Sequence, residues 1–382
     1  MKCMNLYIEE AIDMKKIQKT KIICALILLL TAAGCSAESE GGKVQEPGGS
    51  ITIIDNTGSE AGEPGISIVK IDTYKKLEIS DWMDSDMVIV SKENESLEKM
   101  RLEELSDSYP RSLYLYNLNT KKYQLLKEEK ELNLGGAKLS PDKKNLLYYG
   151  SSLGDLSYYV LNLENLKSFG ISGESIGSAG SANWADKDTV IGAGYTSGAY
   201  YASTEGKITS LEELGPKNVY IVNKIKDTVY YNTADNNTLM ALDLSTGKTV
   251  SLNLPDVFGL YPAPDENQIL VLQYRGAKQI LLLCDRDGSN VKTIAEGVEL
   301  GGVSWSPDQR MIAYSMKGDE SGTAVSGLYL YDMLTGKSTR IAVDISNAAT
   351  CWSPSGEELV YTQWDGKQYN SSIVYLEYSL QK

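Results

Sequence analysis

The chain has 382 residues, 42% of them hydrophobic, and its formal net charge is −14 at pH 7. A protein this acidic is a poor partner for nucleic acid, because phosphates attract basic surfaces. The sequence contains no histidine. This excludes histidine-based acid–base catalysis, the common Ser-His-Asp triad and His-ligated zinc or copper sites.

Residues 1–35 resemble a bacterial lipoprotein signal peptide. Four lysines between residues 15 and 21 precede the apolar run 22–30, and small residues lead to Cys35. The run is shorter than the about 20 residues that a membrane span needs. We expect Cys35 to become the lipidated, palmitate-bearing first residue of a protein on the extracytoplasmic face of the cell membrane. An ordinary secretory signal or an uncleaved anchor is the alternative, and translation can start at Met1 or at Met14.

Residues 36–65 are rich in Gly, Ser and Glu, with little strand pattern. Such a composition buries too little apolar surface to fold by itself. We therefore expect a flexible tether between the membrane and a folded domain at residues 66–382.

The folded domain is organised around a unit that is most complete at residues 303–337. It contains a short strand ending at Trp305, a turn at Ser306-Pro307-Asp308, two alternating strands and a second turn at 334–337. Similar turns follow Trp82, Leu139, Trp184, Asn223, Pro262 and Trp352. The aspartates of these turns are expected to cap backbone N–H groups, and the tryptophans to pack between neighbouring units.

The spacing of these seven anchors predicts the fold. Trp82 and Trp352 are 270 residues apart over six steps, an average of about 45, which is the period of a four-stranded propeller blade. We predict an all-β propeller of antiparallel four-stranded blades, seven in number, with six as the alternative. The last unit has room for three strands only, so residues 66–71 should supply its fourth strand and close the ring.

The repeat is similar to that of the TolB-like family, whose PD40 or WD40-like units combine an S-P-D-G turn with a Y-D-x-x-T-G-K hairpin. The likeness is strongest at Trp305-Ser306-Pro307-Asp308, at 331–336 and at 352–356. It implies the β-propeller fold for residues 66–380. The related propellers that cap peptidases accompany a hydrolase domain, which we do not expect here because the repeat already accounts for residues 66–380.

Acidic residues offer one candidate metal motif, at 285–290. It resembles half of a calcium loop but lacks the glutamate that completes an EF-hand, and Asp287-Gly288 between two strands is a typical hairpin turn. We expect the turn, and we expect neither a metal nor another cofactor.

Two functions remain open. The first is a non-catalytic binding module for a protein, a peptide or a cell-wall glycan. The second is a carbohydrate hydrolase or lyase that uses paired carboxylates, since that chemistry needs no histidine. An enzyme should show two carboxylates converging in a deep pocket, whereas a binder should show an aromatic-lined face built from loops.

The candidate binding face is predicted from loop variation. In a four-stranded blade the loop between the second and third strands, and the connection to the next blade, emerge on one side of the ring, and these loops vary in length. Aromatic and charged side chains occur in them together, a mixture suited to sugars, peptides or cationic groups. The candidate residues are Tyr195, Tyr200, Tyr274, Arg275, Asp319, Glu320, Trp364, Asp365 and Tyr369.

Overall fold

The computed structural model describes residues 43–46, 49–52, 65–102, 107–152, 156–171, 178–194, 198–320 and 323–379. The predicted signal peptide with Cys35 lies outside these residues. In the region predicted as a tether, the described residues form the short strands β1 (Lys43–Glu46) and β2 (Gly49–Thr52), which pair antiparallel. Within the described ranges, no helix has the length and apolar character of a membrane span.

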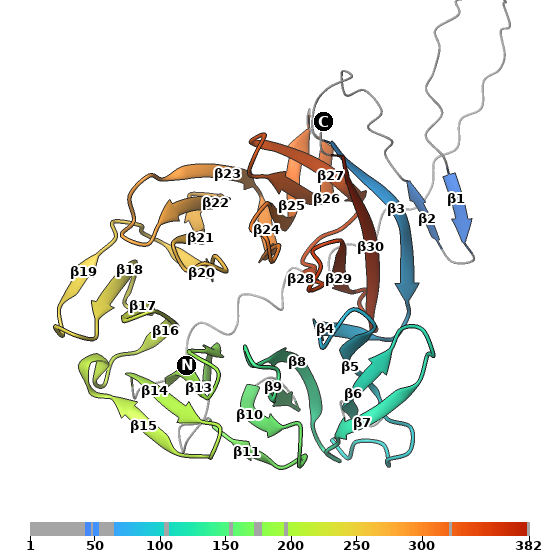
Figure 1. Cartoon of the computed structure of the whole chain (residues 1–382), viewed down its shortest axis with the longest axis horizontal. Helices are drawn as coiled ribbons and strands as arrows, with labels where there is room; N and C mark the ends of the chain where they lie inside the picture. Colours follow the sequence, from blue (N-terminus) through green and yellow to red (C-terminus); the bar gives the residue numbers. More distant parts are fainter. Residues whose placement is uncertain are drawn as a thin grey trace, which may run out of the picture. The chain divides into compact units, whose positions relative to one another are not determined.

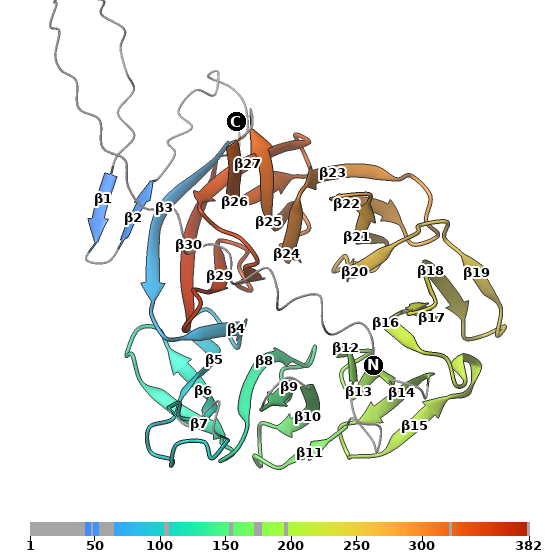
Figure 2. The same ribbon diagram turned by 180° about the vertical axis from the view of Figure 1, so that it is seen from behind.

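Seven four-stranded antiparallel sheets follow one another around a ring (Figure 1, and from behind Figure 2). The all-β prediction with seven blades is confirmed. Blade one contains β4 (Glu78–Trp82), β5 (Met87–Glu93), β6 (Arg111–Asn117) and β7 (Tyr123–Lys127). Blade two contains β8 (Asn133–Leu139), β9 (Asn145–Ser151), β10 (Leu156–Asn162) and β11 (Ser168–Gly170). Blade three contains β12 (Ser178–Trp184), β13 (Thr189–Gly194), β14 (Gly198–Ser203) and β15 (Ile208–Leu211).

The remaining four blades repeat this pattern. Blade four contains β16 (Val219–Ile225), β17 (Thr228–Thr233), β18 (Asn236–Asp243) and β19 (Thr249–Ser251). Blade five contains β20 (Val257–Pro262), β21 (Gln268–Arg275), β22 (Lys278–Asp285) and β23 (Lys292–Gly297). Blade six contains β24 (Glu299–Trp305), β25 (Met311–Glu320), β26 (Thr323–Asp332) and β27 (Lys337–Val343). Blade seven contains β28 (Ala349–Trp352), β29 (Glu358–Trp364), β30 (Tyr369–Ser379) and, from the other end of the domain, β3 (Gly65–Tyr74).

Ring closure is as predicted. β3 pairs antiparallel with β30, with Ile66 opposite Tyr378 and Ile71 opposite Val374. Ile66, Ile68 and Ile71 pack against the apolar cluster between blades six and seven. The closing strand therefore contributes both hydrogen bonds and apolar contact to blade seven, and it joins two distant parts of the chain.

Apolar residues that alternate along the strands fill the spaces between blades, as half-buried strands require. The cluster between blades four and five is typical, with Val271, Ile280 and Leu282 from one sheet facing Leu239 of the next. The expected packing of the tryptophans is confirmed. Trp184 Nε1 donates to the carbonyl of Lys138 at 3.0 Å, and Trp305 Nε1 donates to that of Tyr261 at 3.2 Å, in each case across to the preceding blade.

The ring has two different faces. We call the side with the short turns after the first and third strands of each blade the turn face. The other side carries the loops after the second strand and the connections between blades, and we call it the loop face. In blade six the connection after the second strand is short, because β25 continues to Glu320 and pairs with β26 from Thr323 onward as a long hairpin.

Candidate functional site

A pocket of about 450 Å³ opens on the loop face where blades seven, one and two meet. Its volume falls within the about 300 to 1,000 Å³ typical of small-molecule sites. The pocket is built from the loop-side ends of six strands, β4, β6, β8, β9, β29 and β30, which belong to three successive blades of the ring (Figure 1). The lining residues are Glu78, Arg111, Asn133, Leu134, Tyr149, Ser151, Trp364 and Tyr369.

A buried ion pair forms part of the pocket wall. Arg111 Nη2 lies 3.4 Å from Glu78 Oε2, and the two side chains are only 12% and 10% exposed. Glu78 Oε1 also accepts a hydrogen bond from Gly136 N at 2.9 Å. Arg111 donates to the Ser91 carbonyl at 2.6 Å and to Ser91 Oγ at 3.1 Å. Both charged groups are thereby held in one orientation, as a binding site requires.

Burial raises the pKa of Glu78, and the Arg111 charge and the Gly136 N–H oppose that rise. The dominant cause is desolvation, which disfavours a carboxylate inside a protein. Burial likewise raises the pKa of Tyr149, with the neighbouring carboxylate of Glu78 adding to the effect. Tyr149 is therefore a neutral hydroxyl at ordinary pH, able both to donate and to accept hydrogen bonds.

Two glycines make the close approach of these side chains possible. A Cβ on Gly135 would lie 3.0 Å from the Tyr149 hydroxyl and 3.1 Å from Glu78 Oε2. Gly136 has a φ of +57°, and a Cβ there would overlap the Tyr149 ring. Only glycine accepts both the positive φ and the lack of space without strain. The Gly135-Gly136 pair in β8 therefore leaves the room that the Tyr149 and Glu78 side chains occupy.

Trp364 and Tyr369 form an aromatic wall. Their ring centroids are 4.9 Å apart in an edge-on arrangement, and the Trp364 side chain is 55% exposed. The Arg111 guanidinium lies over the Tyr369 ring, 5.0 Å from its centroid. An exposed tryptophan beside planar, hydrogen-bonding groups is suited to a ligand with one apolar face and a polar edge.

Of the predicted binding residues, Trp364, Asp365 and Tyr369 come together at this pocket or beside it. Trp364 and Tyr369 line it. Asp365 instead caps the turn between them, since its Oδ1 accepts from Lys367 N and Gln368 N at 2.9 Å and its Oδ2 accepts from Asn370 Nδ2 at 2.8 Å. Its function in the site is thus to hold the loop that presents Trp364.

Among the described residues, the other predicted positions do not line this pocket. Tyr274 and Arg275 are exposed at the hairpin of blade five, where Tyr274 packs on Phe258. Asp319 and Glu320 lie in β25, in a strand rather than a loop. Tyr195 lies outside the described residues.

Tyr200 was predicted on the binding face, and this prediction is wrong. Its side chain is 8% exposed and packs in the apolar cluster between blades two and three. The reason is its partner in the sheet. Tyr200 lies opposite Gly192, and a Cβ at that glycine would overlap the tyrosine ring. Gly192 therefore leaves the room in which the tyrosine ring is buried.

Sequence reasoning missed Glu78, Arg111 and Tyr149. They belong to three different strands of blades one and two, and they reach Trp364 only because blade seven closes against blade one. One signal could have found two of them: Glu78 and Arg111 are charged residues at the very start of apolar strands, β4 and β6.

In the described ranges, no group of three or more His, Cys, Asp or Glu side chains is arranged to hold a metal ion. Both cysteines in these ranges, Cys284 and Cys351, are free thiols. The Cys284 thiol is buried, and burial raises its pKa to about 12. An un-ionised thiol is a poor nucleophile and a poor metal ligand.

No protein-family model matches the sequence, and no curated protein matches it. Solved structures do match. An oligogalacturonate lyase in complex with manganese is 13% identical, with a TM-score of 0.54 over 83% of this chain and 98% of that one. An oligogalacturonate lyase from Vibrio parahaemolyticus is 13% identical, with a TM-score of 0.55 over 82% and 98%. TolB from Acinetobacter baumannii is 14% identical, with a TM-score of 0.48 over 77% and 65%. At these identities the likeness concerns the fold alone: the chain has the fold of a seven-bladed β-propeller.

Proposed function

We propose that this protein is a membrane-anchored binding module whose loop-face pocket holds a sugar unit of a glycan. The observation that carries the proposal is the aromatic wall of Trp364 and Tyr369 above a buried, charge-compensated pair of Glu78 and Arg111. A sugar ring presents C–H groups on its faces and hydroxyls at its edge. The exposed indole fits the face, and Tyr149, Asn133 and Arg111 offer donors and acceptors to the edge.

The number of carboxylates favours binding over hydrolysis. Hydrolysis of a glycosidic bond commonly uses two carboxyl groups that flank the bond. The pocket lining contains one, Glu78, and that group is already occupied by Arg111 and by Gly136 N–H. Two solved propellers of the same fold are named as oligogalacturonate lyases, and oligogalacturonate is an oligosaccharide. This supports a glycan as the proposed ligand class.

A glycan array tests the ligand class, followed by titration of any hit with purified residues 36–382. Trp364→Ala should weaken binding by about tenfold or more, because a buried aromatic contact is worth about 1.5 kcal/mol or more. The matched control is Tyr274→Ala, which removes another exposed aromatic side chain from the same face. It should change the affinity less than about twofold.

Thermal unfolding shows whether each variant remains folded. A glycan that binds wild type and Trp364→Ala equally well would place the site elsewhere. Capture of peptides but of no glycan would show that the ligand class is wrong.

The second part of the proposal concerns location. Cys35 is proposed to carry the lipid, with residues 36–65 as the tether that holds the propeller off the membrane. The support is the positive, apolar and small-residue pattern that precedes Cys35. Cys35→Ala should leave an unprocessed precursor or release the protein, and should abolish incorporation of labelled palmitate. Unchanged processing and membrane retention would contradict the anchor without affecting the binding proposal.

A further inference from the structure

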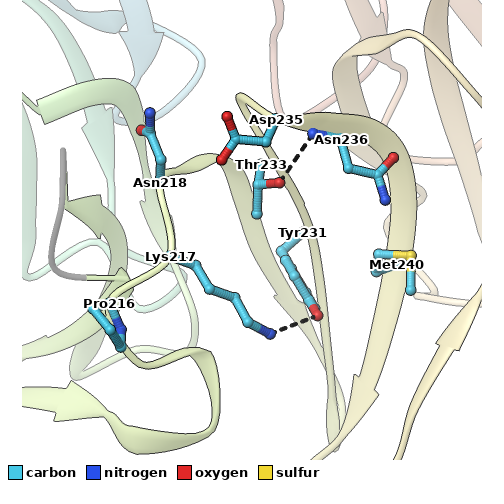
Figure 3. A pocket seen from close by; sticks show the side chains of 8 residues that line it. All are labelled: Pro216, Lys217, Asn218, Tyr231, Thr233, Asp235, Asn236 and Met240. Atoms are coloured by element: carbon cyan, nitrogen blue, oxygen red, sulfur yellow. Dashed lines mark hydrogen bonds between the residues drawn. The ribbon is translucent and has the colours of Figure 1, made fainter.

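A second pocket, of about 490 Å³, opens on the loop face between blades three and four (Figure 3). It shares no residue with the Trp364 pocket. The connection between the two blades forms one side and the β17–β18 hairpin forms the other. The lining residues are Pro216, Lys217, Asn218, Tyr231, Thr233, Asp235, Asn236 and Met240.

The backbone around Lys217 is fixed by its neighbours. The Lys217 carbonyl accepts hydrogen bonds from Gly198 N and from Val219 N, both at 3.0 Å. Gly198 has a φ of +79°, and a Cβ there would overlap the Gly215 carbonyl. The connection is thus pressed directly against the start of β14. Lys217 projects from a rigid support rather than from a free loop.

The cationic end of the pocket consists of Lys217 and Tyr231. Lys217 Nζ donates to the Tyr231 hydroxyl at 3.4 Å and lies 5.3 Å from the centre of its ring. Tyr231 is 4% exposed, so its position is set by the core. A lysine ammonium has three N–H donors. Within the described ranges, Tyr231 is its one hydrogen-bond partner, which leaves donors for a ligand.

The anionic end lies at the hairpin. Figure 3 shows Asp235 beside Asn218 and Thr233, away from the Lys217 ammonium. The hairpin is anchored, because Ala234 N donates to the Asn218 carbonyl at 2.9 Å and Asn236 N donates to Thr233 Oγ1 at 3.2 Å. Within the described ranges, the Asp235 carboxylate forms neither a salt bridge nor a hydrogen bond. One cation and one anion therefore line the same cavity without neutralising each other.

We infer that this pocket binds a small zwitterion, of the size of an amino acid or a dipeptide. Its carboxylate lies at Lys217 and the Tyr231 hydroxyl, and its ammonium lies at Asp235 and the Asn218 side-chain oxygen. Opposite charges at two ends of a cavity attract a ligand with both charges and reject one in which either charge is blocked. Met240 and Pro216 supply the apolar surface between the two ends.

The inference is tested by calorimetry on residues 36–382 with three probes: alanyl-alanine, its N-acetyl derivative and its C-terminal amide. The free dipeptide should bind about tenfold or more tightly than either blocked form, because each block removes one charge-assisted contact. In Lys217→Met, the free dipeptide should no longer bind more tightly than the amide, but should still bind more tightly than the acetylated form. In Asp235→Asn, the free dipeptide should no longer bind more tightly than the acetylated form, but should still bind more tightly than the amide.

Matched controls separate this result from a general effect of charge. Lys207→Met and Asp227→Asn change exposed residues of the same two blades on the turn face, and should leave all three affinities unchanged. Trp364→Ala should also leave them unchanged, since it affects the other pocket. No saturable binding of alanyl-alanine, or equal affinity for the three probes, overturns the inference. A loss on Lys207→Met equal to that on Lys217→Met overturns it as well.

Discussion

The turn face and the loop face of the ring follow opposite rules. On the turn face the same hydrogen bonds recur. Ser140 Oγ accepts from Asn145 N at 3.0 Å and Ser306 Oγ accepts from Met311 N at 2.8 Å, and each serine also donates to the aspartate two residues later. On the loop face, the two pockets have no residue pattern in common. The hydrogen bonds that repeat from blade to blade are those of the turn face. The proposed binding sites lie on the loop face, at positions where the blades differ.

Blade seven keeps the hydrogen bonds of the turn although its sequence differs. Ser355 stands where the other turns have an aspartate, and the lost carboxylate is supplied by Glu358 instead. Both Ser353 Oγ and Ser355 Oγ donate to Glu358 Oε2. The same turn is reached with different residues, so the hydrogen-bond pattern, rather than any one side chain, is what the turn face preserves.

The largest loss of stability is expected from removal of the closing strand. Deletion of residues 66–72 removes most of the β3–β30 pairing and three isoleucines from the last blade. We expect a fall in melting temperature of about 10 °C or more, from several lost hydrogen bonds and about 5 kcal/mol of apolar contact. Differential scanning calorimetry measures it.

The matched control is deletion of residues 36–62, which keeps β3 intact. It should shift the melting temperature by less than about 2 °C. If the two deletions have equal effects, the closing strand contributes no more than the segment before it.

A single turn should separate stability from binding. Ser306→Ala removes one buried hydroxyl that accepts from Met311 N and donates to Asp308, and should lower the free energy of unfolding by about 1 to 3 kcal/mol. Ligand affinity should not change. Ser210→Ala, at an exposed strand position, is the control and should have little effect on either quantity. Denaturant unfolding measures the first quantity and calorimetric titration the second. A variant of Ser306 that loses binding but not stability would mean that the turn face is the functional one.

The smallest expected effect concerns Glu78. Its folded-state pKa is raised above the ordinary value of 4.5, so the unfolded chain loses this proton first as pH rises. The contribution of Glu78 to stability is therefore complete below its ordinary pKa of 4.5, and it decreases as the pH rises from there through the folded-state pKa. The melting temperature of wild type minus that of Glu78→Gln should fall as pH rises from about 4 to about 7.

Glu205→Gln, in an exposed turn, controls for the removal of one carboxylate. A difference between wild type and Glu78→Gln that grows with pH would show that attraction to Arg111 outweighs burial.

The fold could be predicted from the sequence because its determinants are local and repeated. Trp305 with Ser306 and Asp308 defines one turn, and six looser copies give the period. Closure followed from counting strands after Trp352. The site could be predicted only in part. Trp364 and Tyr369 are near each other in sequence, so one loop revealed both.

Glu78, Arg111 and Tyr149 could not be assigned to the same site in this way. They approach the Trp364 loop across two blade boundaries, and no local sequence pattern in their strands predicts that contact. Tyr200 shows the reverse error: its position after a loop suggested exposure, but Gly192 opposite it allows burial.

Because β3 pairs with β30, it remains without its partner strand until nearly the whole chain has been synthesised. Ser67 and Glu377 are hydrogen-bonded although 310 residues separate them. At about 5 to 20 residues per second, β3 waits roughly 15 to 60 s for its partner. During that time it is a free strand that other chains could pair with. A break in register at Val69 and the adjacent charged pair of Lys70 and Asp72, 2.9 Å apart, make it a poor template for such pairing.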